Sequence, residues 1–450
     1  MKYLAMSFLF LVGLAQAKPT FLDSVQRLKW DDLEVVWIED DKFPRFTASI
    51  FFQDGALSDP MAGLTQATFD QFTAGTSKET QRQLAEFFDF YGANLKHTVT
   101  HEYSVLSIQA LTKDIKPVMG KVCEIFKDAK FPEDELNSYV SRSRSHLKNL
   151  VTSHSALADR IFRSLSLEGT IYAKPVEGSL ESFGRFTSKL LKDRLAQLNK
   201  TKKILYLSGP AGVKEMRDVL RKDCQWSHEA RATAGPLKKP EPESVIYLAD
   251  VPGDANQAQI RIGRYLTYDE IKGKSDQFQF LSTFLGGGFT SKLVQELRVK
   301  RGLTYSAGAY VSMQRDYGRA GIITFSKNET AAEAISIIRD VFQEVGAGVV
   351  TPQEFEHQQG HLIGGYAFGF EETTAFLGQI MQYDHQGRDL EELVNFPQTI
   401  KKMTPATLSQ ADLEVYPWDR MTILVLGDKS LAKSLSRIRP VKLIRYEDYL

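Results

Sequence analysis

Cysteine is scarce in this sequence, which has only Cys123 and Cys224 among its 450 residues. Two cysteines cannot build a disulfide framework or a zinc ribbon. Both lie in segments that we expect to be a buried helix and a helix end, so we interpret them as small core residues. An oxidising compartment would allow them to pair.

An excess of charge of either sign is also missing, because Lys plus Arg equals Asp plus Glu at 56 each. No net field therefore favours nucleic acid or an anionic membrane surface, and we predict no nucleic-acid partner. After the first residues, no run approaches the roughly 20 apolar residues that a membrane span needs. We therefore predict a chain without a membrane span.

The one apolar run stands at the N-terminus, where Lys2 precedes the run Tyr3 to Leu14 and Ala15-Gln16-Ala17 follows it. A short apolar run followed by a small-x-small pattern is typical of a cleaved signal peptide. We predict a signal peptide over residues 1–17, a mature chain from Lys18, and export to a bacterial periplasm.

The mature chain is long enough for two or three domains, and its two parts repeat the same order of elements. Residues 231–244 have linker composition and separate a half at 18–230 from a half at 245–450. Each half contains a strand, a helix, a Pro-initiated second helix, a later helix and an apolar strand that ends at glycine. Strands grouped with runs of helices predict an α+β fold, with an antiparallel sheet covered by helices on one face in each half.

One stretch of the second half carries a specific motif, from Leu285 to Gly308. Three glycines stop a helix rich in Phe and Leu, Ser or Thr caps the next helix, and Arg298 lies near its C-terminal end. Tyr305 then opens a strand. An Arg at a helix C-terminus and a Tyr packed beneath it could also be purely structural.

This motif, the duplicated architecture and the chain length resemble the insulinase and pitrilysin (inverzincin) peptidases, including mitochondrial processing peptidase and short bacterial relatives. The resemblance implies two halves that enclose a chamber. It also implies that the matching Arg298 and Tyr305 bind substrate and stabilise the oxyanion at a zinc site across that chamber.

Peptidases of that family carry His-x-x-Glu-His on the first helix of the N-terminal half. In the same register this sequence has Gln66 and Asp70 at the two ligand positions and Phe69 at the position of the base. A phenyl ring cannot accept a proton from water. The third ligand, an acid on a later helix, is missing too, because the sequence has no acid between Glu135 and Asp159. That helix presents instead a basic set: Arg142, Arg144, His146 and Lys148.

Two other histidine pairs could be considered as metal ligands. His97 and His101 would lie roughly 13 Å apart on an extended strand, too far for one ion. His357 and His361 are spaced to chelate on a helix, but the internal repeat matches their helix to the later helix of the first half. A solitary peptidase with a metal at His357 and His361 is therefore the least favoured of three hypotheses.

The first hypothesis is a zinc-lacking, non-catalytic subunit of a heterodimeric peptidase that hydrolyses extended peptides. This chain would bind no cofactor itself, while a homologous partner with an intact His-x-x-Glu-His would hold zinc. The second is a peptidase-like scaffold, as in the core subunits of the respiratory cytochrome complex. Only the first requires Arg298 and Tyr305 for activity.

Overall fold

The computed structural model describes residues 21–224, 226, 229, 242–251 and 256–450. The predicted signal peptide lies outside these residues, and so does most of the predicted linker. The boundaries at 18–230, 231–244 and 245–450 therefore stay predictions, although each of the two sheets takes its strands from one side of the linker. No helix in the described ranges is long and apolar enough to cross a bilayer.

Two six-stranded sheets form the framework, and each has its own hydrophobic core. In the first sheet the spatial order is β1-β2-β6-β3-β5-β4, and in the second it is β12-β7-β11-β8-β10-β9. The strands of the first sheet are β1 Val25–Trp30, β2 Leu33–Glu39, β3 Arg45–Phe52, β4 Asn94–Val99, β5 Ser104–Leu111 and β6 Lys203–Gly209. Those of the second are β7 Ile246–Asp250, β8 Gln257–Thr267, β9 Ala307–Met313, β10 Tyr317–Lys327, β11 Thr422–Gly427 and β12 Val441–Arg445.

The strand order repeats between the sheets, as the duplicated sequence predicts. β2, β6, β3, β5 and β4 correspond in order to β7, β11, β8, β10 and β9. The α+β class is confirmed, but the prediction of antiparallel sheets was incomplete. β2 pairs with β6 in parallel, and β7 does so with β11 and β12. The reason is that β6 and β11 return to the sheet after long helical connections. Such connections can bring the chain back in either direction, so parallel pairing becomes possible.

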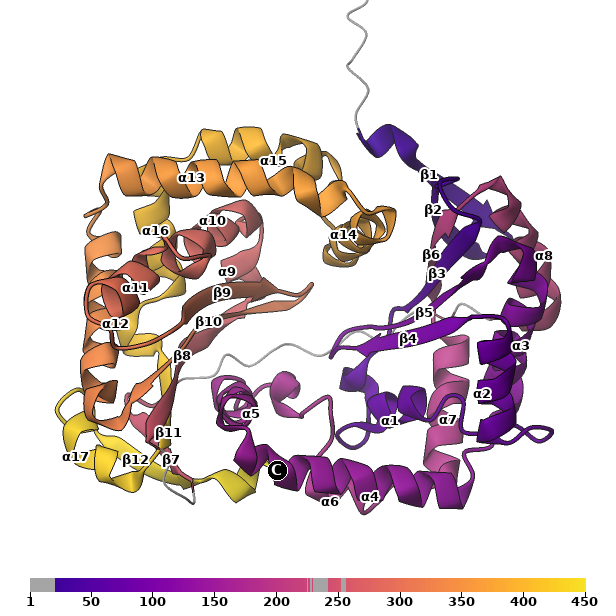
Figure 1. The fold of residues 1–450 in the computed structure, drawn as a ribbon, viewed down its shortest axis with the longest axis horizontal. Coiled ribbons are helices and arrows are strands. Elements are labelled where there is room, and N and C mark those ends of the chain that lie inside the picture. Colours follow the sequence, from indigo (N-terminus) through magenta and orange to yellow (C-terminus); the bar gives the residue numbers. More distant parts are fainter. Residues whose placement is uncertain (1–20, 225, 227–228, 230–241, 252–255) are drawn as a thin grey trace, which may run out of the picture.

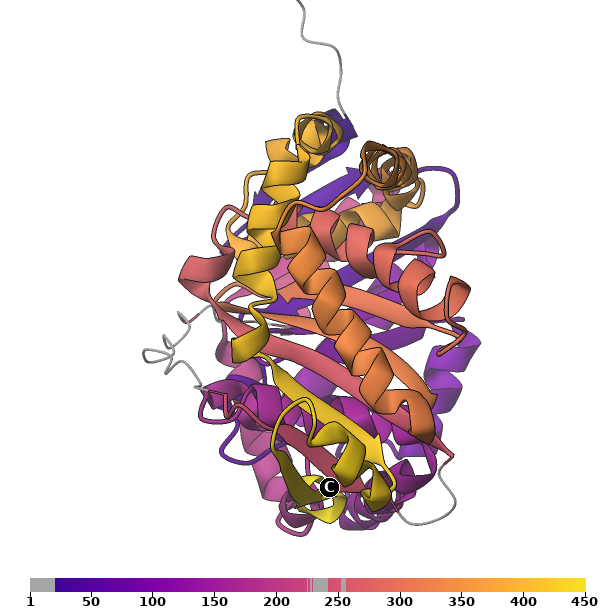
Figure 2. The ribbon, with the colours of Figure 1, turned by 90° about the vertical axis from the view of Figure 1, so that its left-hand side faces the viewer.

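Each half contributes its own set of helices, most of which cover the outer face of its own sheet (Figures 1 and 2). In the first half they are α1 Leu64–Asp70, α2 Gln81–Phe90, α3 Ile115–Asp128, α4 Glu133–Asn149, α5 His154–Ser166, α6 Leu180–Phe183, α7 Ser188–Lys200 and α8 Met216–Val219. In the second they are α9 Tyr268–Ile271, α10 Ser275–Gly286, α11 Lys292–Val294, α12 Ala331–Gly346, α13 Pro352–Tyr366, α14 Thr373–Gln386, α15 Glu391–Lys401, α16 Pro405–Val415 and α17 Ala432–Leu435.

The inner faces are covered by an exchange of helices between the halves. Helix α5 of the first half packs on β8 and β11, and α14 of the second half packs on β6 (Figure 1). Each sheet therefore has helices on both faces, which corrects the prediction of one covered face. The sequence cause lies in the central strands, since β6 and β11 are buried at every position and so need apolar neighbours on both sides.

The two cysteines are buried, as expected, but they are bonded to each other rather than free. Cys123 on α3 and Cys224 have Cα atoms 4.5 Å apart and lie 101 residues apart in the sequence. The bond closes a loop that includes most of the first half's helices, so it restricts the unfolded chain strongly.

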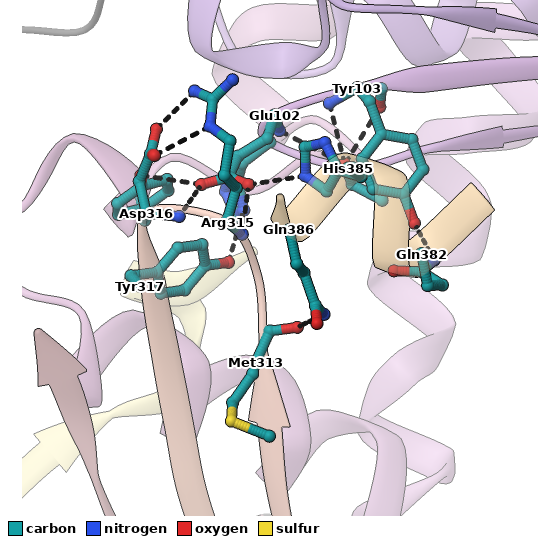
Figure 3. Close-up of polar contacts among 12 residues, drawn as sticks. Glu102, Tyr103, Met313, Arg315, Asp316, Tyr317, Gln382, His385 and Gln386 are labelled. Carbon is teal, nitrogen blue, oxygen red and sulfur yellow. Dashed lines mark hydrogen bonds and ion pairs between the residues drawn. The ribbon is translucent and has the colours of Figure 1, made fainter. Parts of the chain in front are cut away.

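The halves meet at Glu102, in the turn between β4 and β5 (Figure 3). The Glu102 carboxylate is 0% exposed. Nε2 of His385 on α14 lies 2.8 Å from one oxygen. The backbone N–H groups of Arg315 and Asp316, in the turn between β9 and β10, donate to the carboxylate at 2.9 and 3.1 Å.

Residues on either side of Glu102 extend this contact. The ring of His101 lies 3.2 Å from the Tyr317 hydroxyl, and Gln382 donates to the hydroxyl of Tyr103 at 2.6 Å. A pocket of about 450 Å³ beside this junction is lined by both halves. The larger chamber that the resemblance implies stays a prediction.

The charge of Glu102 makes the junction sensitive to acid. Burial opposes ionisation, but the hydrogen bond from His385 and those from the backbone hold the pKa of Glu102 below its ordinary value. Its stabilising contribution is therefore complete above the unfolded-state pKa of about 4.3 and is lost as the pH falls through the lower folded-state value.

We predict that Glu102→Gln lowers the free energy of unfolding by about 3 kcal/mol at neutral pH, because an amide cannot replace the charge between buried donors. The wild type should lose this advantage as the pH falls below about 4. Chemical denaturation at several pH values measures both effects. Glu356→Gln, at an exposed position of α13, is the control and should change little. Equal stability of the Glu102 and Glu356 variants at pH 7 would contradict the prediction.

Candidate functional site

Helix α1 carries the three residues in the zinc-motif register, and a buried ion cluster fixes where it begins. Asp59 accepts hydrogen bonds from the backbone N–H and the hydroxyl of Thr65, at 2.8 and 2.6 Å. Arg194 of α7, 1% exposed, donates to Asp54 at 2.7 Å and lies 3.1 Å from Asp59. The start of α1 is therefore held by buried side chains whose charges are paired with each other.

Asp70, at the second ligand position, is held by three neighbouring side chains. The Gln66 amide donates to one Asp70 oxygen at 3.0 Å, and Nε2 of His97 lies 2.9 Å from the same oxygen. The Tyr139 hydroxyl of α4 donates to the other oxygen at 2.9 Å. Burial, reinforced by the Asp70 charge, raises the pKa of Tyr139 far above its ordinary value, so this hydroxyl stays a donor.

Phe69, at the position of the catalytic base, belongs to the core of the first half. Its side chain is 3% exposed, and its ring centroid lies 5.8 Å from both the Phe52 ring and the His97 ring. It therefore contributes packing where a base would have to reach solvent.

The residues around Asp70 do not fit zinc. Asp70 and His97 are the two groups there that could ligate, and they bond to each other through a hydrogen bond. In the described part of the chain no group of three or more His, Cys, Asp or Glu side chains could hold a metal ion. The chemistry left at this position is that of a polar hydrogen-bond network.

The histidines at positions 101, 357 and 361 do not supply metal ligands near Asp70. His101 is buried against Tyr317 and the carbonyl of Lys174, so it is separated in function from His97. On α13, Nε2 of His357 lies 3.0 Å from the hydroxyl of Thr290, and His361 is exposed.

Arg298 and Tyr305 flank a short turn in front of the edge strand β9. Arg298 lies in a π-helical turn over Gln295–Val299, and its guanidinium carbon sits 5.2 Å from the ring centroid of Phe289. The Tyr305 side chain is 76% exposed. At the end of α10 only glycine fits at position 286, because a Cβ there would come within 2.0 Å of a backbone nitrogen of β9.

Neither Arg298 nor Tyr305 lines the pocket around Asp70. The chain thus holds two separate remnants, one on α1 with its ligands replaced and one before β9 with its polar side chains exposed.

Comparison with known proteins agrees with this architecture. Residues 34–175 match the family model described as insulinase (peptidase family M16), and residues 189–362 match the model described as peptidase M16 inactive domain. Together these two matches cover most of the chain. The chain belongs to the M16 insulinase family.

Relatives within the M16 family differ in their described activity. An uncharacterised zinc protease, YmxG of Bacillus subtilis, is 21% identical over 352 residues, covering 74% of this chain and 81% of the relative. A Helicobacter pylori protein described as the non-peptidase homolog YmxG is 20% identical over 381 residues, covering 83% and 86%. A crystal structure of a peptidase M16 inactive domain from Pseudomonas fluorescens superposes with a TM-score of 0.79 at 20% identity, covering 90% of this chain and 98% of that one.

Tyr139 is the site residue that sequence reasoning missed, and His97 was considered only as a metal ligand paired with His101. His97 shares one face of β4 with Leu95 and Val99, because strand side chains alternate, and that face packs toward α1. The alternation was a usable signal for His97. Tyr139 had no such signal, since its contact with Asp70 depends on how α4 crosses α1.

The geometry predicts that zinc binding can be restored without activity. In Gln66→His with Asp70→His, the new imidazoles and His97 would supply three nitrogen ligands, the number of protein ligands in catalytic zinc sites. We expect about one equivalent of bound zinc in a competition assay with a chromogenic chelator, and no peptide hydrolysis, because Phe69 cannot act as a base.

Adding His97→Ala to the double variant is the control and should abolish binding. A double variant that takes up no zinc, or one whose zinc is indifferent to His97, would show that the three side chains do not converge.

Proposed function

We propose that this chain is the zinc-lacking subunit of a heterodimeric zinc peptidase that hydrolyses unfolded peptides. In this proposal a homologous partner with an intact His-x-x-Glu-His supplies the metal and the base. This chain supplies Arg298 and Tyr305, which bind the substrate and stabilise the oxyanion at the partner's active site.

The contrast between the two remnants carries this proposal. At α1 the ligand positions are occupied by Gln66 and Asp70, which are bonded within the chain, and Phe69 is buried. Before β9, by contrast, Tyr305 projects into solvent and Arg298 contacts the exposed ring of Phe289. A guanidinium and a phenol left exposed are available to a molecule that approaches from outside.

Edge strands make an extended peptide the preferred substrate. β4 and β9 are the last strands of their sheets, and their outer edges present backbone N–H and C=O groups. An extended peptide can add to such an edge through main-chain hydrogen bonds, which favours unfolded segments over folded proteins. Tyr305 immediately precedes one of these edges.

Export from the cytoplasm, to a bacterial periplasm, is part of the proposal. The Cys123–Cys224 disulfide supports it, because structural disulfides persist mainly in oxidising compartments. The signal-peptide pattern of residues 1–17 agrees.

A scaffold or peptide-binding protein without a catalytic role is the second candidate. The Helicobacter pylori relative described as a non-peptidase homolog favours it. In that case Arg298 and Tyr305 would be dispensable for any activity of a complex.

The test uses this chain mixed with its zinc-bearing homologue. We predict that Arg298→Ala lowers the turnover of an unfolded peptide by about a hundredfold, as the loss of one oxyanion donor does elsewhere. Tyr305→Phe, which keeps the ring and removes the hydroxyl, should lower turnover by a similar factor. Gel filtration should find the complex intact in both variants.

Arg339→Ala on the outer helix α12 is the control and should leave turnover unchanged. Full activity of the Arg298 and Tyr305 variants would favour the scaffold. Equal activity of the partner alone and of the mixture would remove the need for this chain.

A further inference from the structure

A pocket of about 790 Å³ lies where α1, α4 and α5 meet, beside the Asp70 network. Its lining comes from these helices and the segment that follows them. The polar part of the lining consists of Gln66, Asp70, Gln71, Tyr139, Arg142, Ser143, His146, Asp159, Arg160, Arg163 and Glu177.

One face of α4 forms a wall of hydrogen-bond donors. Tyr139, Arg142, Ser143 and His146 follow the i, i+3, i+4, i+7 spacing that places side chains on one side of a helix. This wall has no acid, and Tyr139 already uses its hydroxyl on Asp70. An anion at this wall would therefore meet cationic donors, and the Asp70 carboxylate in the same lining is already bonded to Gln66, His97 and Tyr139.

The other charged groups facing the pocket are engaged. Asp159 accepts from Arg261 of the second half at 2.6 Å, and Arg163 pairs with Glu177 at 2.5 Å. Arg160 donates to two backbone carbonyls, at 2.6 and 2.8 Å. The carboxylates of Asp159 and Glu177 are therefore already paired and do not neutralise the positive charge of Arg142 on α4.

Arg142 and His146 make no hydrogen bond or ion pair with any other residue that the structure describes. Apolar side chains stand next to them in the lining, namely Leu147, Leu150 and Phe183. A ligand that combines a negative charge with an adjacent apolar group satisfies both parts of this surface.

We propose that this pocket binds the C-terminal carboxylate of an extended peptide whose last side chain is apolar. The carboxylate pairs with Arg142, which offers two donors in a plane, and His146 adds a third. The terminal side chain packs on Leu147, Leu150 and Phe183.

A peptide is the favoured source of the carboxylate because the pocket adjoins an edge strand. His97, within β4, contacts Asp70, which lines the pocket, so β4 and the pocket share a boundary. A peptide paired along β4 would reach the pocket with its end. The proposal rests on the proposed function only because it takes a peptide as the ligand. In it, the pocket beside Asp70 binds the end of that peptide and does not cleave it.

Binding to the isolated chain, without a partner, tests the pocket separately from peptidase activity. The probes are fluorescent peptides of one unstructured sequence ending in leucine, as the free acid and as the C-terminal amide, followed by anisotropy. We expect the amide to bind at least about tenfold more weakly, the loss of one charge-assisted contact. Replacing the final leucine by aspartate should also weaken binding.

Arg142→Gln should reduce the affinity for the acid to that for the amide, whereas Arg142→Lys should retain part of the difference. Arg144→Gln is the matched control, because Arg144 is exposed on the same helix outside the pocket lining. Equal binding of acid and amide, or binding of neither, would overturn the proposal. Displacement of the acid peptide by inorganic phosphate, at a concentration where equal ionic strength of chloride has no effect, would identify a site for free anions instead.

Discussion

The buried carboxylate of Glu102 is the interaction on which the arrangement of the two halves depends. A fully buried charge needs donors, and every donor to Glu102 except the nearby Tyr172 hydroxyl comes from the second half. Separating the halves would leave the carboxylate without most of its partners, at a cost far above that of a surface ion pair. The turns β4–β5 and β9–β10 are thus held against each other and against α14. The exchanged helices α5 and α14 then complete each other's sheets, so neither half has a finished core alone.

The start of α1 is held by residues other than those that match the family's zinc motif. Arg194, Asp54 and Asp59 hold the start of α1 through paired, buried charges that do not involve the ligand positions. The start of α1 is therefore anchored by contacts that do not involve Gln66, Phe69 or Asp70. A phenyl ring in the core and a carboxylate satisfied by neighbouring donors are stable substitutes, whereas an unpaired ligand set near the core would carry a desolvation cost.

Local patterns in the sequence predicted the parts of the structure that depend on local physics. The duplicated order of elements and the Pro-initiated helices follow from periodicity and capping. The assignment of Phe69 to the position of the base came from the family resemblance instead. Other features depend on pairs of residues far apart in the chain. The parallel pairing of β2 with β6, the disulfide, the contact of Tyr139 with Asp70 and the junction between Glu102 and His385 fall in this class. The sequence contains each of these residues but not the crossing angles that bring them together.

The two sets of residues that match the family's motifs, one before β9 and one on α1, differ in what they can offer another molecule. Around Arg298, the backbone is fixed by a π-helical turn and by Glu296, which pairs with Lys300 and Arg301. The side chains that project from this rigid turn include exposed apolar ones, and apolar surface around a cation is typical of a binding site. At Asp70, by contrast, the polar groups already bond to each other, and only the α4 wall faces a ligand. In the two proposals above, the first set is contributed to a complex, and the second receives a peptide end. Both proposals fit a chain with the M16 fold in whose described residues no group of three or more His, Cys, Asp or Glu side chains could hold a metal ion.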